Sequence, residues 1–300
     1  MDDILFLSEF PKPDSKMPVL RRERHSGGLT GTALVAARRL GRTCAYAGCL
    51  GDDSLSRFIL DGFTAEGISV DHVVRRPESR PIHSTILVDT SRTTRTILYE
   101  DGGETGAHPS EPSEEVLRSA GVLLVDNVSL EGMVRAARIA REAGIPVVAD
   151  IERGGAALVS ELVDLSDHLI VPLDFAQART GETGPAEATR RLWRRDRAAV
   201  VVTCGAEGSW YVSAEEPDAL FHQPAFPVAV VDTNGCGDVF HGAYAAALSE
   251  GRGMADRVRR AAAVAALKAT QPGGQAGIPT RQRAEEFLRE RAGQAERERV

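Results

Sequence analysis

Residues 230–243, VVDTNGCGDVFHGA, join an apolar stretch to a run of small, helix-compatible residues through a turn framed by two glycines. The pattern predicts a strand, a tight turn and a helix that begins near Asp238. Gly235 and Gly237 allow the main chain to turn sharply and to approach a ligand closely, because they carry no side chain. A junction of this kind is typical of a parallel α/β sheet, so it limits the chain to that class of fold.

The chemistry of this turn follows from the helix that it opens. A helix N-terminus presents unpaired N–H groups and the positive end of the helix dipole, which together bind a phosphate or a developing anion. A carboxylate at the same place repels a phosphate, but it can take a proton from an attacking hydroxyl group. The turn therefore indicates phosphoryl transfer to an alcohol with Asp238 as the base. The alternative is an aspartate that only complements the helix dipole.

Short apolar runs bounded by turn residues alternate with helical patterns along the chain. The predicted strands cover residues 43–50, 84–88, 122–125, 146–149, 168–171 and 198–203. The predicted helices cover residues 30–40, 130–143, 156–165, 186–194 and 255–269. This alternation predicts a mostly parallel sheet with helices on both faces and with ligands at the carboxyl ends of the strands. No repeat or linker divides the sequence, so residues 1–300 are expected to form one domain.

Residues 81–100, PIHSTILVDTSRTTRTILYE, break this alternation and predict two strands around a polar turn. Such a hairpin must cover a site, pair with another molecule or stand free in solvent.

The net charge of −7 argues against binding to the phosphate backbone of a nucleic acid. The arginine clusters at residues 21–24, 190–197 and 257–260 are therefore interpreted as solvated helix faces. No apolar run approaches the roughly 20 residues that cross a bilayer, and residues 1–16 lack the features of a secretion signal. We expect a soluble, cytoplasmic protein that does not bind a membrane.

The cysteines show no paired spacing and mostly stand in apolar runs, which favours reduced, buried thiols. They are Cys44, Cys49, Cys204 and Cys236.

The heptapeptide DTNGCGD, residues 232–238, is similar to the DTxGAGD motif of the ribokinase-like (PfkB) carbohydrate kinases, with Cys236 in place of the usual alanine. The resemblance covers nearly the whole chain. It implies a three-layer fold with a mostly parallel central sheet and a small β lid over the sugar. It also implies that Gly235, Cys236 and Gly237 form the anion hole and that Asp238 is the catalytic base.

The lid of this family combines the hairpin region with a segment near the N-terminus. Here these segments correspond to residues 81–100 and to about residues 5–25. Because the family lid often makes the dimer contact, the resemblance also implies a homodimer through the lid.

SGGLTGTALVAARRLG, residues 26–41, looks like the family's sugar-binding signature, in which paired glycines let the sugar approach the main chain. These glycines are Gly27 and Gly28. Thr32 replaces an asparagine that bonds a sugar hydroxyl in the family, and a threonine offers one hydroxyl where the asparagine offers an amide. The alternative is a glycine turn before a helix that Thr30 caps.

Asp3 falls where the family has an aspartate that holds two sugar hydroxyls, just after a first buried strand. Only Met1 and Asp2 precede it, so that strand is missing from the sequence pattern. Either the start site is assigned too far downstream, or the sheet lacks a member and Asp3 is poorly anchored.

VVTCGAEGSW, residues 201–210, resembles the family's nucleotide segment and implies an ATP site at Thr203, Gly205, Glu207 and Gly208. Alone, the pattern is an ordinary pair of strands joined by a glycine turn.

The lid sequence TTRTIL, residues 93–98, is similar to a lid strand of the ketohexokinase branch whose arginine reaches ATP. This similarity suggests Arg95 as a phosphate contact, and the alternative is an exposed cross-strand charge.

ALKATQPGGQAGIPT, residues 266–280, resembles the family's adenine-side helix and loop, with Gly274 on the nucleotide side. In relatives this loop also helps to enclose a monovalent cation such as K⁺. The chain has three lysines, and a chain so rich in arginine is expected to keep lysine where a compact ammonium is needed. One of the three, Lys268, stands in this segment, where its alternative role is to cap its helix.

The family's NxxE motif, which orders magnesium-bound water, is absent. The strand HLIV is followed by PLDFA, with Pro172 and Phe175 at the key positions and Asp174 as the candidate substitute. Mg²⁺ would then rely on ATP oxygens, on water and on Asp174.

Within the family, residues 11–16 and the tail from Gln223 most resemble the ketohexokinase and sulfofructose kinase branches. Lys16 matches a sulfonate-binding lysine, but Asn127 and Val128 stand where the partner arginine is expected. Without that guanidinium a sulfonate loses its bidentate partner, so an unmodified or differently substituted sugar is expected.

These observations predict a kinase that transfers the γ-phosphate of ATP to a primary hydroxyl of a small carbohydrate. Two alternatives stay open: a nucleoside or vitamin-alcohol kinase of the same fold, and a sugar-binding relative that has lost catalysis.

Overall fold

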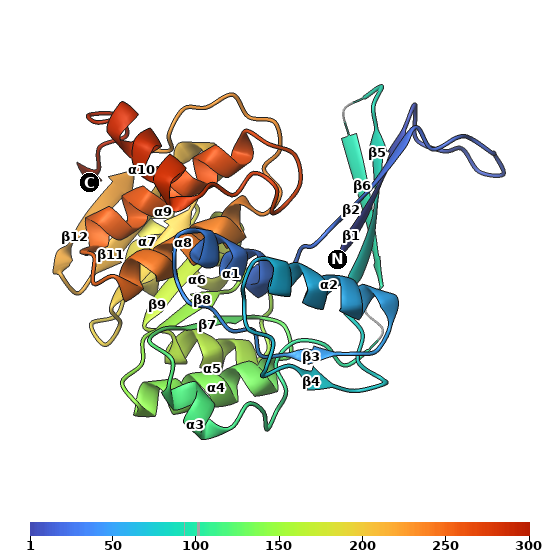
Figure 1. The fold of residues 1–300 in the computed structure, drawn as a ribbon. Helices are drawn as coiled ribbons and strands as arrows, with labels where there is room; N and C mark the ends of the chain where they lie inside the picture. Colours follow the sequence, from blue (N-terminus) through green and yellow to red (C-terminus); the bar gives the residue numbers. More distant parts are fainter. Residues whose placement is uncertain (93, 101–102) are drawn as a thin grey trace.

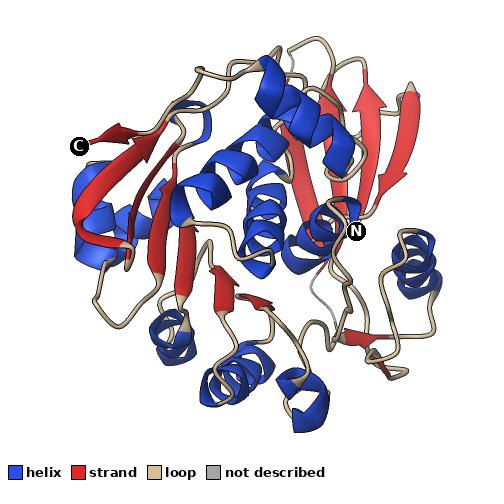
Figure 2. Ribbon diagram, turned by 60° about the vertical axis from the view of Figure 1, so that its left-hand side comes forward, coloured by secondary structure: helices blue, strands red, loops and turns tan. Residues whose placement is uncertain are grey.

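The computed structural model describes the chain except for residues 93 and 101–102, so the first threonine of the TTRTIL motif lies outside the described residues (Figure 1). Two main sheets organise the described part. A central sheet of seven strands is packed between helices, and a four-stranded sheet stands beside it. Figure 2 shows the two groups of strands with helices between them.

The central sheet is half parallel and half antiparallel, in the order β13-β12-β11-β10-β9-β8-β7. Its parallel strands are β7 (Leu123–Asp126), β8 (Val147–Asp150), β9 (His168–Pro172) and β10 (Ala199–Thr203). Its antiparallel strands are β11 (Ser209–Ser213), β12 (Glu216–Gln223) and β13 (Glu298–Arg299). The predicted parallel sheet is confirmed for four strands, and the antiparallel half makes the sheet mixed.

Alternate residues of the parallel strands enter two different cores, which gives the fold its three layers. Val148 and Ile170 pack against α1 (Leu29–Arg39), α8 (Cys236–Ser249) and α9 (Met254–Ala269). Val147 and Leu169 face the opposite layer of α4 (Leu130–Glu142), α5 (Ala157–Leu165), α6 (Leu173–Thr180) and α7 (Pro185–Leu192). Strands that are buried on both faces need continuous apolar sequences, which these strands have.

Smaller elements complete the described chain. They are α2 (Ser54–Ala65), α3 (Glu114–Arg118), α10 (Arg281–Glu290), the 3₁₀ turn Gly205–Glu207, and the two-residue strands β3 (Cys49–Leu50) and β4 (Val74–Arg75). None of the helices in the described ranges combines the length and the apolar character that spanning a bilayer would require.

The second sheet is the lid, with strand order β2-β1-β5-β6. It combines β1 (Asp2–Leu7) and β2 (Arg21–His25) with the hairpin β5 (His83–Asp89) and β6 (Thr94–Glu100). The predicted hairpin is therefore observed, and the early segment joins it from Asp2 onward. The arginine cluster at residues 21–24 lies on β2, so its interpretation as a helix face is wrong.

Two predicted strands are not observed at their predicted length among the described residues. In the range 43–50 only β3 and two isolated bridges form, from Ala45 to Ser69 and from Cys49 to Gly106. The apolar residues before the DTNGCGD turn form no strand, and Val230 and Val231 are 61% and 62% exposed. A strand requires a hydrogen-bonded neighbour, and hydrophobicity alone does not supply one.

A cavity of about 790 Å³ lies at the free edge of the central sheet. Its walls include β7, the irregular residues 43–47, Met1 and apolar residues of α1 and α8. β1 joins the lid, so the outer edge of β7 has no partner strand among the described residues.

Candidate active site

The turn at residues 232–238 forms the start of α8. Gly235 is the N-cap residue with φ of +77°, a conformation that glycine adopts without the steric cost of a side chain. The N–H of Val239 bonds the carbonyl of Gly235 at 2.9 Å, and that of Cys236 bonds the carbonyl of Thr233 at 3.2 Å. Within the described chain, the N–H groups of Gly237 and Asp238 have no main-chain partner, so they are available to an anion.

Asp238 lies half-buried in the first turn of α8. Burial raises the pKa of its carboxyl well above 3.8, and the nearby charges of Asp150, Glu152 and Asp126 raise this pKa further. A raised pKa strengthens a carboxylate as a proton acceptor near neutral pH, which suits a general base.

Two further carboxylates stand at the ends of adjacent parallel strands. Asp126 ends β7 and Asp150 ends β8, and the two are partners in the register. Asp126 accepts hydrogen bonds from the hydroxyl of Thr30 at 2.6 Å and from the N–H of Val128 at 2.8 Å. Burial raises the pKa of both carboxyls, and Oδ2 of Asp150 has no hydrogen-bond partner among the described residues.

His241 connects α8 to these strand ends. Its Nδ1 lies 2.8 Å from the carbonyl oxygen of Gly237, and its Nε2 lies 3.0 Å from the carbonyl oxygen of Ile170 on β9. The imidazole is buried, and burial lowers its pKa. The N-terminus of α8 is thereby fixed over the carboxyl ends of the parallel strands.

The C-terminal loop and the lid both reach the turn. Gly274 lies against Gly235, where an added Cβ would approach the carbonyl oxygen of Gly274 to 3.0 Å. Asp232 accepts a hydrogen bond from the N–H of Gly273 at 2.8 Å. Nη1 of Arg95 on β6 lies 4.0 Å from Oδ1 of Asp232. Gly274 and Arg95 are therefore both placed beside the turn at residues 232–238.

On the sugar side, the structure brings Asp2 rather than Asp3 to the glycine pair. A Cβ on Gly27 would lie 2.7 Å from Oδ2 of Asp2, whereas Gly28 has φ of +86° and open space around it. The carboxylate of Asp3 accepts hydrogen bonds from Nε and Nη2 of Arg24, at 2.7 and 2.8 Å. Its Oδ2 lies 3.0 Å from Nε2 of His83.

This placement of Asp3 corrects the sequence analysis. Neighbouring residues of a strand point to opposite faces, so only one of the two carboxylates faces the turn. Asp3 is also well anchored, and the hydrogen bond from Arg24 lowers its pKa to about 2. Thr32 is 1% exposed and accepts a long hydrogen bond of 3.4 Å from Gln275, so it does not line an open surface.

The nucleotide segment forms the predicted pair of strands with a glycine turn. Thr203 ends β10, and Gly205 and Glu207 are exposed in the turn that follows. Gly208 has φ of +94°, and a side chain there would collide with the main chain of Gln223. Gly208 is therefore required by the local fold, whereas the exposed turn is free to meet a ligand.

Asp174, the candidate that the sequence offers for Mg²⁺, is not among the carboxyls whose charges act on Asp238. Asp174 is exposed on α6. The charges that raise the pKa of Asp238 come from Asp150, Glu152 and Asp126. No group of three His, Cys, Asp or Glu side chains in the described ranges is close enough to enclose a metal ion. A few carboxylate oxygens are enough for Mg²⁺, because this ion keeps several waters and binds ATP phosphates.

The ammonium of Lys268 stands beside the turn at residues 232–238. The main-chain oxygen of Asp232, at the entrance of the turn, already accepts a hydrogen bond of 2.9 Å from the ammonium of Lys268. A positive charge therefore stands beside the turn as part of the chain.

Sequence reasoning missed Asp2, Asp150 and His241 as members of the site. A signal was present for Asp150, because VVAD and LLVD each place an aspartate directly after a buried strand. No local pattern distinguishes Asp2 from Asp3, since the choice depends on which face of β1 meets the glycine turn.

Comparisons with known proteins identify the family of the chain. The family model of the pfkB family carbohydrate kinases matches residues 1–281. The ribokinase of Haemophilus influenzae is 28% identical over 298 residues, which cover 96% of this chain and 95% of the relative. The aminoimidazole riboside kinase of Salmonella typhimurium is 28% identical over 285 residues, 87% of each chain.

Among solved structures, the ribokinase of Arabidopsis thaliana complexed with ribose and ATP has a TM-score of 0.82 at 24% identity and covers 96% of this chain and 95% of that chain. It shows that the fold is shared. These relatives are ribokinases and a riboside kinase, so they do not support the expected closeness to the ketohexokinase and sulfofructose kinase branches. The chain belongs to the pfkB family of carbohydrate kinases and is an ATP-dependent sugar kinase, a phosphotransferase with an alcohol group as acceptor.

Proposed function

We propose that the chain transfers the γ-phosphate of ATP to a primary hydroxyl of ribose or a similar small furanose, with Asp238 as the general base. One observation carries the proposal: the carboxylate of Asp238 stands in the first helical turn beside the unpaired N–H groups of α8. A base and an anion site in one turn are the two parts that phosphoryl transfer to an alcohol requires.

In this proposal the sugar lies between the glycine pair and the lid. Gly27 and Gly28 allow its ring to approach the main chain, and Asp2 accepts hydrogen bonds from its hydroxyls. Asp238 removes the proton of the primary hydroxyl as that oxygen attacks phosphorus. The N–H groups of Gly237 and Asp238 then stabilise the charge that develops on the transferred group.

ATP is proposed to lie along the carboxyl edge of the sheet, near Thr203, Gly205 and Glu207, with its phosphates between Gly274 and Arg95. The position of Arg95 beside Asp232 supports this arrangement. Mg²⁺ bound to the phosphates would neutralise their charge, and Asp150 and Glu152 would hold its waters. Closure of the lid would exclude bulk water, which limits hydrolysis of ATP.

A riboside is the second candidate substrate, because the aminoimidazole riboside kinase is as similar in identity as the ribokinase. The two candidates share the ribose ring and differ in the group on the anomeric carbon. A panel of ribose, other pentoses, ketohexoses, aminoimidazole riboside and inosine, with release of ADP as the readout, separates them.

The test of mechanism is Asp238→Asn. We expect turnover to fall by about a hundredfold to ten-thousandfold, the usual contribution of a general base. Binding of ADP, measured by calorimetry, should persist, because the amide leaves the turn in place. Asp61→Asn, on the exposed face of α2, is the matched control and should keep full activity. Undiminished turnover in Asp238→Asn would refute the assignment of the base.

We also propose that residues 1–300 act as one kinase domain and that two copies associate through the lid. The whole of β6 is exposed at an edge of the lid sheet, including Ile97, Leu98 and Tyr99. Large exposed apolar side chains on an open sheet edge favour association. Light scattering of the protein and of Leu98→Lys tests this contact.

A cytoplasmic location is proposed as well. All cysteines are unpaired, which favours a reducing compartment.

A further inference from the structure

Lys268 is a buried lysine next to the catalytic turn. It lies in the last turn of α9 and is 0% exposed. The two other lysines, Lys12 and Lys16, are exposed in the segment between β1 and β2. A buried ammonium is costly unless nearby groups compensate its charge, so its position calls for a physical reason.

Its ammonium completes the set of bonds that holds Asp232. The N–H of Asp232 donates to the carbonyl of Ala269 at 3.1 Å, at the end of the same helix. The carboxylate of Asp232 accepts from the N–H groups of Asn234 at 2.9 Å and Gly273 at 2.8 Å. Nζ of Lys268 donates to the carbonyl of Asp232 at 2.9 Å. The entrance of the turn is thus fixed to α9 and to the C-terminal loop at once.

The surrounding charges favour a cation at this place. Burial lowers the pKa of Lys268, and the negative charges of Asp232 and Asp238 act in the opposite direction. The C-terminal end of α9 adds the negative end of its dipole. The positive charge of Arg95, on the lid, lowers the pKa of Lys268 as burial does. The ammonium is therefore compensated by the acidic groups of the turn itself.

We propose that the ammonium of Lys268 is the built-in monovalent cation of this active site, so that the turn at residues 232–238 keeps its shape without K⁺ from solution. The inference rests on the proposed function and deepens it. Lys268 is a positioning residue, because a side chain with no exposed surface does not touch a bound phosphate. It acts through Asp232, which precedes Gly235 and Asp238 in the same turn.

The first experiment measures the unmodified protein in K⁺ and in tetramethylammonium, a cation too large to replace K⁺ among main-chain oxygens. Two readouts are used: the rise in melting temperature caused by ADP, and turnover with the best sugar of the panel. We expect both to be the same in the two cations. A turnover or an ADP-induced shift that needs K⁺ would overturn the proposal.

The second experiment removes the ammonium. In tetramethylammonium, Lys268→Met should lose up to about a hundredfold in kcat, because a small displacement of the catalytic groups is enough for a loss of that size. Addition of K⁺ or NH₄⁺ should restore part of the lost rate and of the ADP-induced shift. Lys12→Met is the matched control and should remain insensitive to the cation. A Lys268→Met variant that equals the parent protein in tetramethylammonium would contradict the inference.

The two readouts separate this inference from the proposed function. If no sugar is phosphorylated, the proposed function fails, and the dependence of ADP binding on the cation still decides the role of Lys268. If Lys268→Met does not fold, the measurement on the unmodified protein decides, and Lys268→Arg, which keeps the charge, should fold and stay insensitive to K⁺.

Discussion

Nδ1 of His241 lies 3.2 Å from Oδ2 of Asp150, and the same nitrogen lies 2.8 Å from the carbonyl oxygen of Gly237. The imidazole thus lies between the end of β8 and the turn at the start of α8, and its Nδ1 is hydrogen-bonded to Gly237 and not to Asp150. Asp150 also raises the pKa of Asp238, so the protonation of one carboxyl affects that of the other. The protonation of the base therefore depends on a residue that does not belong to the DTNGCGD motif.

Asp150→Asn should shift the pH profile of the enzyme. The pKa of Asp238 is raised by burial and then by the charge of Asp150, so removal of that charge lowers it. Asp238 must be ionised to act as a base, and activity is lost as pH falls through its pKa. The acidic limb of kcat/KM should therefore move to lower pH in Asp150→Asn. Asp61→Asn should leave the profile in place, and an unmoved limb in Asp150→Asn would show that the two carboxyls are not coupled.

The adjacent carboxylates of β1 offer a matched pair of variants. Asp2 faces Gly27, whereas Asp3 is held by Arg24 and His83. Asp2→Asn should raise KM for the sugar by about tenfold to a hundredfold, the value of hydrogen bonds to a charged group. Asp3→Asn should change KM for the sugar less and should weaken the lid sheet, measured by hydrogen exchange in β1 and β2. If Asp3→Asn raised KM for the sugar more than Asp2→Asn did, Asp3 and not Asp2 would be the residue that contacts the sugar.

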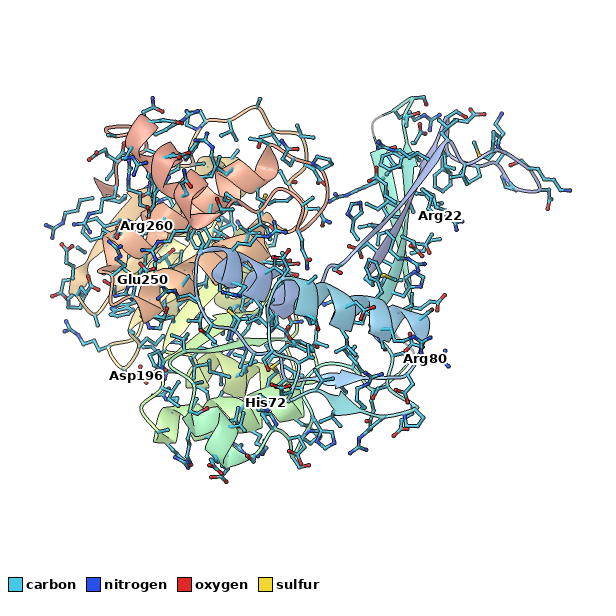
Figure 3. The ribbon with its side chains drawn as sticks, viewed as in Figure 1. Arg22, His72, Arg80, Asp196, Glu250 and Arg260 are labelled. Carbon is cyan, nitrogen blue, oxygen red and sulfur yellow. The ribbon has the colours of Figure 1, made fainter. Side chains whose placement is uncertain are left out.

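Arg95→Gln should weaken the interaction of the lid with ATP. The guanidinium lies 4.0 Å from Asp232 and is half exposed, so it is free to turn toward a phosphate. We expect a higher KM for ATP with little change in melting temperature. Arg22→Gln is the control, because Arg22 lies on strand β2 of the same sheet and is exposed (Figure 3). If Arg95→Gln and Arg22→Gln had equal KM values for ATP, Arg95 would be a surface charge that does not contact ATP.

The central layers and the catalytic turn were predictable because their signals are local. The buried strand residues 147–149 are apolar on both faces, and Gly235, Gly237 and Asp238 stand at fixed spacing in one turn. Helical periodicity located α1, α4 and α9 to within two residues.

The elements that were missed depend on partners far away in sequence. Residues 43–50 are as apolar as a strand, but most of them have no adjacent strand to bond. The contact of Asp2 with Gly27 depends on the register of β1 with β2, and that of His241 with Ile170 depends on the packing of α8 over the sheet. Such contacts are set by tertiary structure, which a pattern in one segment does not contain.

His168 should make the protein sensitive to acid. It is buried on β9, its Nδ1 lies 3.0 Å from the hydroxyl of Tyr244, and burial lowers its pKa from 6.5 to about 3. Below pH 6.5 the unfolded chain binds a proton that the folded chain does not. The free energy of unfolding should therefore fall as pH decreases from 6.5 toward 3, by up to about 1.4 kcal/mol per pH unit.

His168→Asn tests this source of acid sensitivity. An amide group can replace Nδ1 as the hydrogen-bonding partner of Tyr244, but it does not titrate in this range. Urea unfolding at several pH values should show a smaller slope below pH 6.5 for His168→Asn than for the parent protein. His72→Asn, at a half-buried position outside the central sheet, is the control. An equal slope in His168→Asn would assign the acid sensitivity to other groups.

The cavity beside β7 should accept an added strand. The N–H of Leu123 bonds the carbonyl of Pro146 on the β8 side, so the peptide groups of Leu124 point the other way, toward the cavity. Met1 lines the same cavity, and its amino group donates to the carbonyl of Ile82 at 2.8 Å, as a peptide N–H would. A segment attached to Met1 therefore has both an apolar chamber and a free strand edge to fill.

An engineered extension measures how much this space limits stability. A few β-branched residues added before Met1 should raise the melting temperature, because each buried apolar side chain contributes about 1.5–3 kcal/mol. They should also slow hydrogen exchange at the amide of Leu124, since that group gains a partner. An extension of glycine and serine with the same length is the control and should change neither quantity. If both extensions give the same melting temperature and the same exchange rate, the edge of β7 does not accept a strand, and the cavity is a stable feature of the fold.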